Sequence, residues 1–175
     1  MSHSLHRLRP ADCPALVCVI DTVCGESAWM ATRRFEPTPA WNHALAECGC
    51  LRHVLCVARA GVRLAGWCRI FPEACDRPAE RGELGIGLLR EFRGRGLGTA
   101  LMAFALDQAR QAGFRQIVLT THAGNLPAQR LFQNCGFQPL AQVWPESYAM
   151  VRQLRPAGQL RAQAVCHRLQ TVSGE

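Results

Sequence analysis

The chain has 175 residues and a formal net charge of +7, with 49% hydrophobic and 19% charged residues, which fits one globular domain. No apolar run approaches the roughly 20 residues that a transmembrane helix needs, and the absence of lysine excludes a P-loop of the form GxxxxGK followed by Ser or Thr. The basic N-terminal stretch has no apolar segment behind it, so we expect a cytoplasmic protein without a secretory signal.

The N-terminal part predicts two helices. In residues 9–26, Asp12 can cap a helix, Pro14 suits its first turn and Gly25 is expected to end it. Apolar residues fall on one stripe of this helix: Leu16, Ile20, Val23 and Cys24. A second helix is expected near residues 40–49.

Strands are predicted next. Residues 52–61 and 63–71 are rich in β-forming side chains and are separated by Gly61, which predicts a hairpin. A polar, proline-containing loop at 72–82 leads to a third strand at 83–89.

The last part alternates between helices and strands. Residues 97–113 and 125–136 predict helices that end at a glycine, and Asn125 is the expected N-cap of the second. Strands are expected at 115–122, 137–144 and 147–154.

This order of elements predicts an α/β protein with a mixed, mostly antiparallel central sheet flanked by helices. We expect one domain over residues 1–154, and a polar tail or short added helix over 155–175.

The ten cysteines raise the question of a metal site. The nearest approach to a zinc-binding pattern is Cys48, Cys50 and His53, and no second pair of ligands stands beside it in the sequence. Cysteines with apolar neighbours pack as small hydrophobic residues, so we expect no metal.

A glycine-rich turn follows the strand at 83–89 and opens the helix at 97–113. Free backbone N–H groups and the helix dipole favour an anion there, and Arg93 and Arg95 add charged donors. The turn therefore predicts a phosphate-bearing ligand, with a plain tight turn as the alternative.

Two motifs together resemble the GNAT superfamily of acyl-CoA-dependent N-acyltransferases. Arg93, Gly96 and Gly98 match its coenzyme A loop, Q/R-x-x-G-x-G/A. A downstream block also matches its pattern, at Asn125, Ala128, Leu131, Phe132, Gly136 and Phe137. The resemblance covers about residues 5–154 and is strongest over 83–137.

The resemblance implies acetyl-CoA as co-substrate. The strand before the loop would splay from its neighbour and bind the pantetheine arm and acetyl carbonyl through its main chain, and one N–H there would stabilise the oxyanion. The implied acetyl-CoA-binding residues are Leu88, Leu89, Arg93, Gly94, Arg95, Gly96, Gly98, Thr99, Asn125 and Phe132.

Acetyl transfer needs an unprotonated amine, and alkyl amines have a pKa near 10. Glu83 matches the place where many family members have a glutamate base, and His122 is a second candidate. Phe132 replaces the tyrosine that many members use to protonate the thiolate. Tyr148, the single tyrosine, could substitute, and water is the simpler proton source.

The resemblance places the acceptor among loops that contain Glu26, Trp29 and Trp144, where aromatic faces and a carboxylate suit a cationic amine. We expect an N-acetyltransferase that acts on an unidentified primary amine by direct attack in a ternary complex. A non-catalytic acetyl-CoA-binding module is the alternative. Nucleic-acid binding is less favoured and membrane binding is not expected; a monomer or a homodimer is expected.

Overall fold

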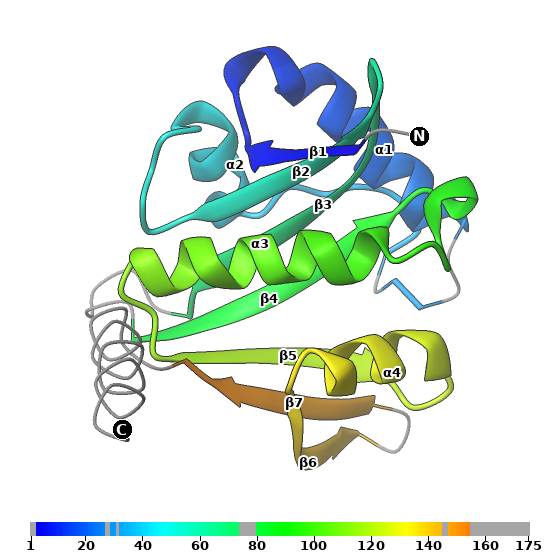
Figure 1. Cartoon of the computed structure of the whole chain (residues 1–175), viewed down its shortest axis with the longest axis vertical. Coiled ribbons are helices and arrows are strands. Elements are labelled where there is room, and N and C mark those ends of the chain that lie inside the picture. The colour runs from blue at the N-terminus through cyan, green and yellow to red at the C-terminus, as the bar shows by residue number, and fades with distance from the viewer. Residues whose placement is uncertain (1–2, 27–28, 31, 74–79, 145–146, 155–175) are drawn as a thin grey trace, which may run out of the picture.

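The computed structural model is shown in Figure 1. It describes residues 3–26, 29–30, 32–73, 80–144 and 147–154, and the side chains of 141–144 are outside that description. The tail at 155–175 is likewise outside the described residues. None of the described helices is both long and apolar enough to cross a membrane.

Seven strands form one sheet in the order β1-β2-β3-β4-β5-β7-β6. The pairing is antiparallel everywhere except between β4 and β5, which run parallel. This confirms the predicted mixed, mostly antiparallel sheet. The strands are β1 (His3–Arg7), β2 (Val54–Ala60), β3 (Arg63–Pro72), β4 (Arg81–Leu88), β5 (Gln116–His122), β6 (Gln138–Trp144) and β7 (Ser147–Gln153).

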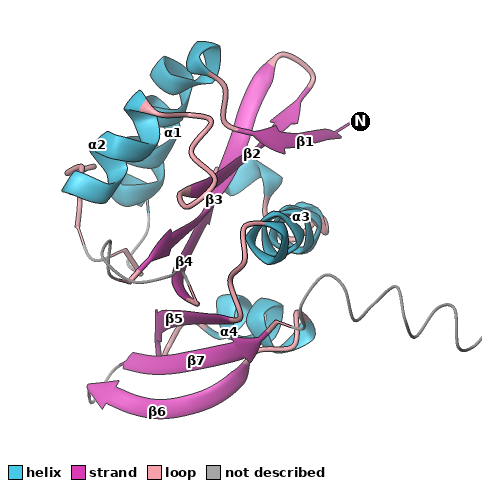
Figure 2. Cartoon of the chain, turned by 90° about the vertical axis from the view of Figure 1, so that its left-hand side faces the viewer, coloured by secondary structure: helices cyan, strands magenta, loops and turns pink. Residues whose placement is uncertain are grey.

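Helices cover both faces of the sheet (Figure 2). The helices α1 (Cys13–Glu26) and α2 (Pro39–Ala46) lie on one face, and α3 (Leu97–Gln111) lies on the other, against β2 and β3. The shorter α4 (Leu126–Asn134) follows β5, and two single 3-10 turns, η1 (Pro10–Asp12) and η2 (Arg90–Phe92), precede α1 and α3.

The apolar stripe predicted for the first helix belongs to the core. All four stripe residues of α1 are buried, and so are six residues of α3, including Leu97, Leu101 and Ala105. The predicted hairpin is β2 and β3, with Gly61 at φ +59° in its turn. Since each predicted strand and helix from residue 52 to 154 is present, the order of elements was predicted correctly there.

Two N-terminal details differ from the expectation. Strand β1 was not predicted, because its short, polar sequence becomes a strand only by pairing with the edge of β2. Asp12 does not cap α1: its buried carboxylate contacts His6 Nε2 at 3.0 Å and accepts from Arg59 at 2.6 Å. Burial alone would raise the pKa of Asp12, but hydrogen bonds from His6, the Arg9 backbone and Arg59 together lower it.

Candidate active site

An opening in the sheet lies between β4 and β5. The two strands pair only over three positions, from Arg81 with Gln116 to Glu83 with Val118. Beyond Glu83, β4 remains paired with β3 as far as Leu88, while its other edge has no strand partner among the residues that the structure describes. The sheet is therefore split from this point toward the C-terminal ends of β4 and β5.

The register of β3 and β4 determines which backbone groups face this opening. The Leu89 N–H donates to Ala65 O at 3.0 Å, so this pair belongs to the hydrogen-bonded type. Hydrogen-bonded and non-bonded pairs alternate along an antiparallel ladder, so the N–H groups of Leu88 and Ile86 point away from β3, toward the opening. Of the two residues implied by the family resemblance, Leu88 therefore offers its amide to a ligand and Leu89 does not.

The glycine-rich turn closes the open end of β4. Gly94 and Gly96 have φ of +71° and +78°, a left-handed conformation that glycine adopts without strain. Gly96 is the N-cap of α3, and no side chain caps this helix end. The first amides of α3, at Leu97, Gly98 and Thr99, therefore have no side-chain cap, and the helix dipole favours an anion at this end.

Arg93 connects this turn to two other elements. Its Nε donates to Leu88 O at 2.8 Å, and its terminal nitrogen contacts Glu26 Oε2 at 3.2 Å. Glu26, which was expected among the acceptor-binding residues, thus lies beside the turn and is bound to an arginine. Arg95 is exposed on the same turn.

Glu83 is the last β4 residue paired with β5, at the point where the strands separate. Its carboxylate, 55% exposed, accepts from Arg69 of β3 at 2.9 Å. The Arg69 guanidinium also lies over the rings of Phe71 and Trp41, 5.2 and 5.9 Å from their centroids. Sequence reasoning missed Arg69, although its place on β3 beside β4 follows from the predicted hairpin and third strand.

His122 ends β5 on the other side of the opening. Its Nδ1 accepts the Gly124 N–H at 3.0 Å, so in the neutral ring the proton is on Nε2, which makes Nε2 a donor. The ring also packs against Trp29 with 4.9 Å between centroids. The structure therefore brings together a predicted catalytic candidate and a predicted acceptor-binding residue from the loop after α1.

Three other predicted residues lie on β7 and on or beside α4. Tyr148 is on β7, where it is paired with Thr121 of β5, and it is 38% exposed. Asn125 caps α4 by accepting the Ala128 N–H at 3.3 Å, as expected. Phe132 is 5% exposed and packs edge-on against Phe137, so it belongs to the core.

One predicted acceptor-binding residue is not placed by the structure. Trp144 is the last residue of β6, and its side chain lies outside the described part of the chain.

Comparison with known proteins agrees with this geometry. The acetyltransferase (GNAT) family model matches residues 20–137. A mycothiol acetyltransferase from Geodermatophilus obscurus is 31% identical over 125 residues, which is 64% of this chain and 41% of that protein. The chain spans less than half the length of the mycothiol acetyltransferases that it matches.

Solved structures share the fold. A GNAT acetyltransferase from Streptococcus pneumoniae has a TM-score of 0.77 at 20% identity, with 88% of this chain and 100% of that one covered. A phosphinothricin acetyltransferase from Sinorhizobium meliloti in complex with acetyl-CoA has a TM-score of 0.73 at 19% identity, with 90% and 92% covered. With a family model that matches about two thirds of its length, the chain belongs to the GNAT family of acetyltransferases.

Proposed function

We propose that this protein transfers an acetyl group from acetyl-CoA to a primary amine by direct attack within a ternary complex. The observation that carries the proposal is the opening between β4 and β5, which leads directly to the uncapped start of α3. An extended thioester arm fits the unpaired edge of β4, and a pyrophosphate fits the free amides that follow it.

The proposed acetyl-CoA contacts follow from the directions in which the backbone N–H groups of β4 point. The amides of Ile86 and Leu88 would bind the pantetheine arm and the acetyl carbonyl, and the one that faces the carbonyl oxygen would stabilise the oxyanion. Arg93 would bind the pyrophosphate by exchanging its contact with Glu26 for the more strongly charged ligand. Asn125 would contact the arm through its side-chain NH₂, since its oxygen is used by the helix cap.

Glu83 is the proposed general base. It is solvent-accessible and lies where β4 and β5 separate, and it would take the ammonium proton directly or through water. Arg69 would keep the carboxylate oriented until the substrate binds. His122 remains a second candidate, and its Nε2–H favours hydrogen-bond donation to the acceptor over proton abstraction. Water would protonate the thiolate, because Phe132 has no hydroxyl group to donate a proton.

The acceptor is proposed only as a class. The relative and the structural neighbour have different names, mycothiol acetyltransferase and phosphinothricin acetyltransferase, so the comparisons do not identify one acceptor. In this chain, the packed rings of Trp29 and His122 lie at the end of β5, on one side of the opening. The Arg69–Glu83 pair lies on the β4 side. This arrangement suits an amine with an apolar or aromatic neighbouring group. A cytoplasmic location and a monomeric or homodimeric state remain predictions from the sequence.

The test is a turnover assay with acetyl-CoA and a panel of small amines, amino acids and peptides, with free thiol and acetylated product both measured. Glu83→Gln should lower turnover most at pH values below the pKa of the amine, where a base is needed. Glu73→Gln is the matched control. Glu73 is also ion-paired with an arginine, Arg81, but it lies where β4 and β5 are still paired and not at the opening. Equal losses in both variants, or a loss independent of pH, would refute Glu83 as the base. Acetyl-CoA binding without turnover of any amine would favour the non-catalytic module.

A further inference from the structure

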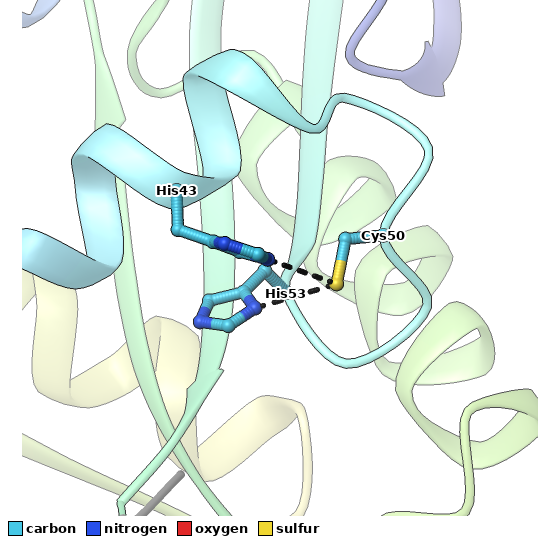
Figure 3. A group of neighbouring side chains, drawn as sticks. All are labelled: His43, Cys50 and His53. Atoms are coloured by element: carbon cyan, nitrogen blue, oxygen red, sulfur yellow. Dashed lines mark hydrogen bonds between the residues drawn. The ribbon is translucent and has the colours of Figure 1, made fainter.

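A second cluster of reactive side chains lies between the end of α2 and the start of β2. Figure 3 shows that His43, Cys50 and His53 point toward one another. His43 Nε2 lies 3.4 Å from Cys50 Sγ, and His53 Nδ1 lies 3.5 Å from the same sulfur. The three ligand atoms all lie within 4.8 Å of one another.

These distances fit a tetrahedral metal ion. With Zn–N near 2.0–2.1 Å and Zn–S near 2.3 Å, a tetrahedral angle puts ligand nitrogen and sulfur about 3.6 Å apart. The two measured nitrogen–sulfur distances are close to this value, so an ion can be bound with only small side-chain movements. The two nitrogens would close to about 3.4 Å under the same geometry.

The loop that carries two of the ligands is fixed by the rest of the fold. The Cys50 N–H donates to the carbonyl oxygen of Glu47, the C-cap of α2, at 2.8 Å. Arg7 of β1 donates to Cys50 O at 2.7 Å and to His53 O at 3.3 Å. The ligands are therefore held in place by main-chain contacts that do not depend on an ion.

The chemistry of the ligands is also suitable. His53 is 8% exposed, and burial, with His43 and Arg52 nearby, lowers its pKa, so its ring is in the neutral form that binds metals. Among the described residues, Nε2 of His53 has no hydrogen-bond partner, and Nδ1 has Cys50 as its partner. Without an ion, one imidazole N–H can donate to the sulfur while the thiol donates to the other imidazole. A thiolate and neutral imidazoles are also both ligand types that zinc binds.

The structure changes which residues belong to the cluster. Cys48, which the sequence pattern grouped with Cys50 and His53, turns away: its sulfur lies 3.5 Å from Cys13 Sγ and 3.3 Å from Leu45 O. His43 takes its place. The sequence pattern did not show it because His43 is on the preceding helix, seven residues before Cys50.

We propose that His43, Cys50 and His53 bind one Zn²⁺ ion, with water as the fourth ligand on the exposed His43 side. Binding releases the thiol proton of Cys50 to solvent, and no redox step is involved. The ion would join the last turn of α2 to the start of β2. Trp41 of α2 and His53 both pack edge-on against Phe71, at 5.3 and 5.2 Å, so the ion would also fix α2 over the sheet.

The test uses the whole protein after chelator treatment, titrated with Zn²⁺ in competition with a chromophoric chelator, and with Co²⁺ as a spectroscopic substitute. We expect one ion per chain, a thiolate-to-Co²⁺ charge-transfer band, and a rise in Tm that saturates with Zn²⁺. His43→Ala and Cys50→Ser should each weaken Zn²⁺ binding by about tenfold or more, and Cys50→Ser should abolish the Co²⁺ band.

Cys48→Ser is the matched control, because Cys48 is on the same loop and faces Cys13. It should bind Zn²⁺ as the unaltered protein does. The proposal is overturned if the unaltered protein binds no more tightly than Cys50→Ser, or if His43→Ala retains full affinity. If Cys50→Ser does not fold, the Co²⁺ spectrum of the unaltered protein and the exposed His43→Ala variant decide. Neither readout depends on acetyl transfer.

Discussion

Two glycines at the start of α3, the N-cap Gly96 and the helical Gly98, should respond in opposite directions to the same substitution. Gly96 has φ +78°, and an added Cβ would meet no atom within 4 Å, so Gly96→Ala introduces backbone strain without a clash. A non-glycine residue in this conformation costs about 1 to 2 kcal/mol. Gly98 has no positive φ and lies in the first turn of α3, where alanine gains up to about 1 kcal/mol over glycine.

The surroundings of Gly98 allow this gain. Its added Cβ would lie 3.4 Å from Leu131 Cδ2 and Leu88 Cδ1, which are ordinary contacts with the ends of flexible side chains. The free energies of unfolding of the two variants should therefore differ by about 2 kcal/mol, with Gly96→Ala the less stable. Urea unfolding followed by circular dichroism measures this difference. If Gly98→Ala is as unstable as Gly96→Ala, or less stable, the backbone geometry assigned to the turn is wrong.

Three further changes test other parts of the structure. Asp12→Asn should lower the free energy of unfolding by about 2 kcal/mol at pH 7, measured by urea unfolding, because Arg59 loses a charged partner. Since the native pKa of Asp12 lies below its ordinary 3.8, this contribution exists above pH 3.8 and disappears as pH falls through the native pKa; a variant difference that persists in acid would contradict it. Burial and a hydrogen bond with Cys48 raise the pKa of Cys13 to about 11, so mass spectrometry should show iodoacetamide modifying exposed Cys18 first at pH 8; equal rates would contradict this. Phe132→Tyr should leave acetyl-CoA affinity unchanged while lowering Tm by a few degrees, because its hydroxyl would be buried in the core; a gain in affinity would refute this placement.

Local sequence signals predicted most of the elements correctly. The hairpin around Gly61 and the helix capped by Asn125 depend on interactions between residues close in sequence, which is why propensity and capping rules found them. Strand β1 depends on pairing with β2, about fifty residues away, and no local signal identifies it.

The candidate site was predicted in part, through motifs that lie on one continuous segment. The glycine-rich turn and Glu83 are in that segment, and the structure places Glu83 where the opening begins and the turn at its other end, after β4. Contacts between distant residues were not predicted: Glu26 is bound to Arg93, and Arg69 is bound to Glu83. His43 was missed for the same reason, because a helix and a loop bring it to Cys50.

The Arg69–Glu83 pair has a consequence for the proposed mechanism. A carboxylate that remains bound to a guanidinium is poorly placed to accept a proton, so the amine or an ordered water must compete with Arg69 for Glu83. Arg69 is therefore expected to influence turnover more than acetyl-CoA binding, since it lies on β3, away from the turn that precedes α3.

Calorimetric titration tests most directly whether the turn before α3 binds the pyrophosphate of acetyl-CoA. Acetyl-CoA should bind saturably, adenosine alone should not, and Arg93→Ala should weaken binding by about tenfold, because a charge-assisted contact is lost. Arg63→Ala, which removes an exposed arginine paired with Glu91, is the control and should bind as the unaltered protein does. No binding of acetyl-CoA, or equal affinity in Arg93→Ala and the unaltered protein, would show that the turn is not the pyrophosphate site.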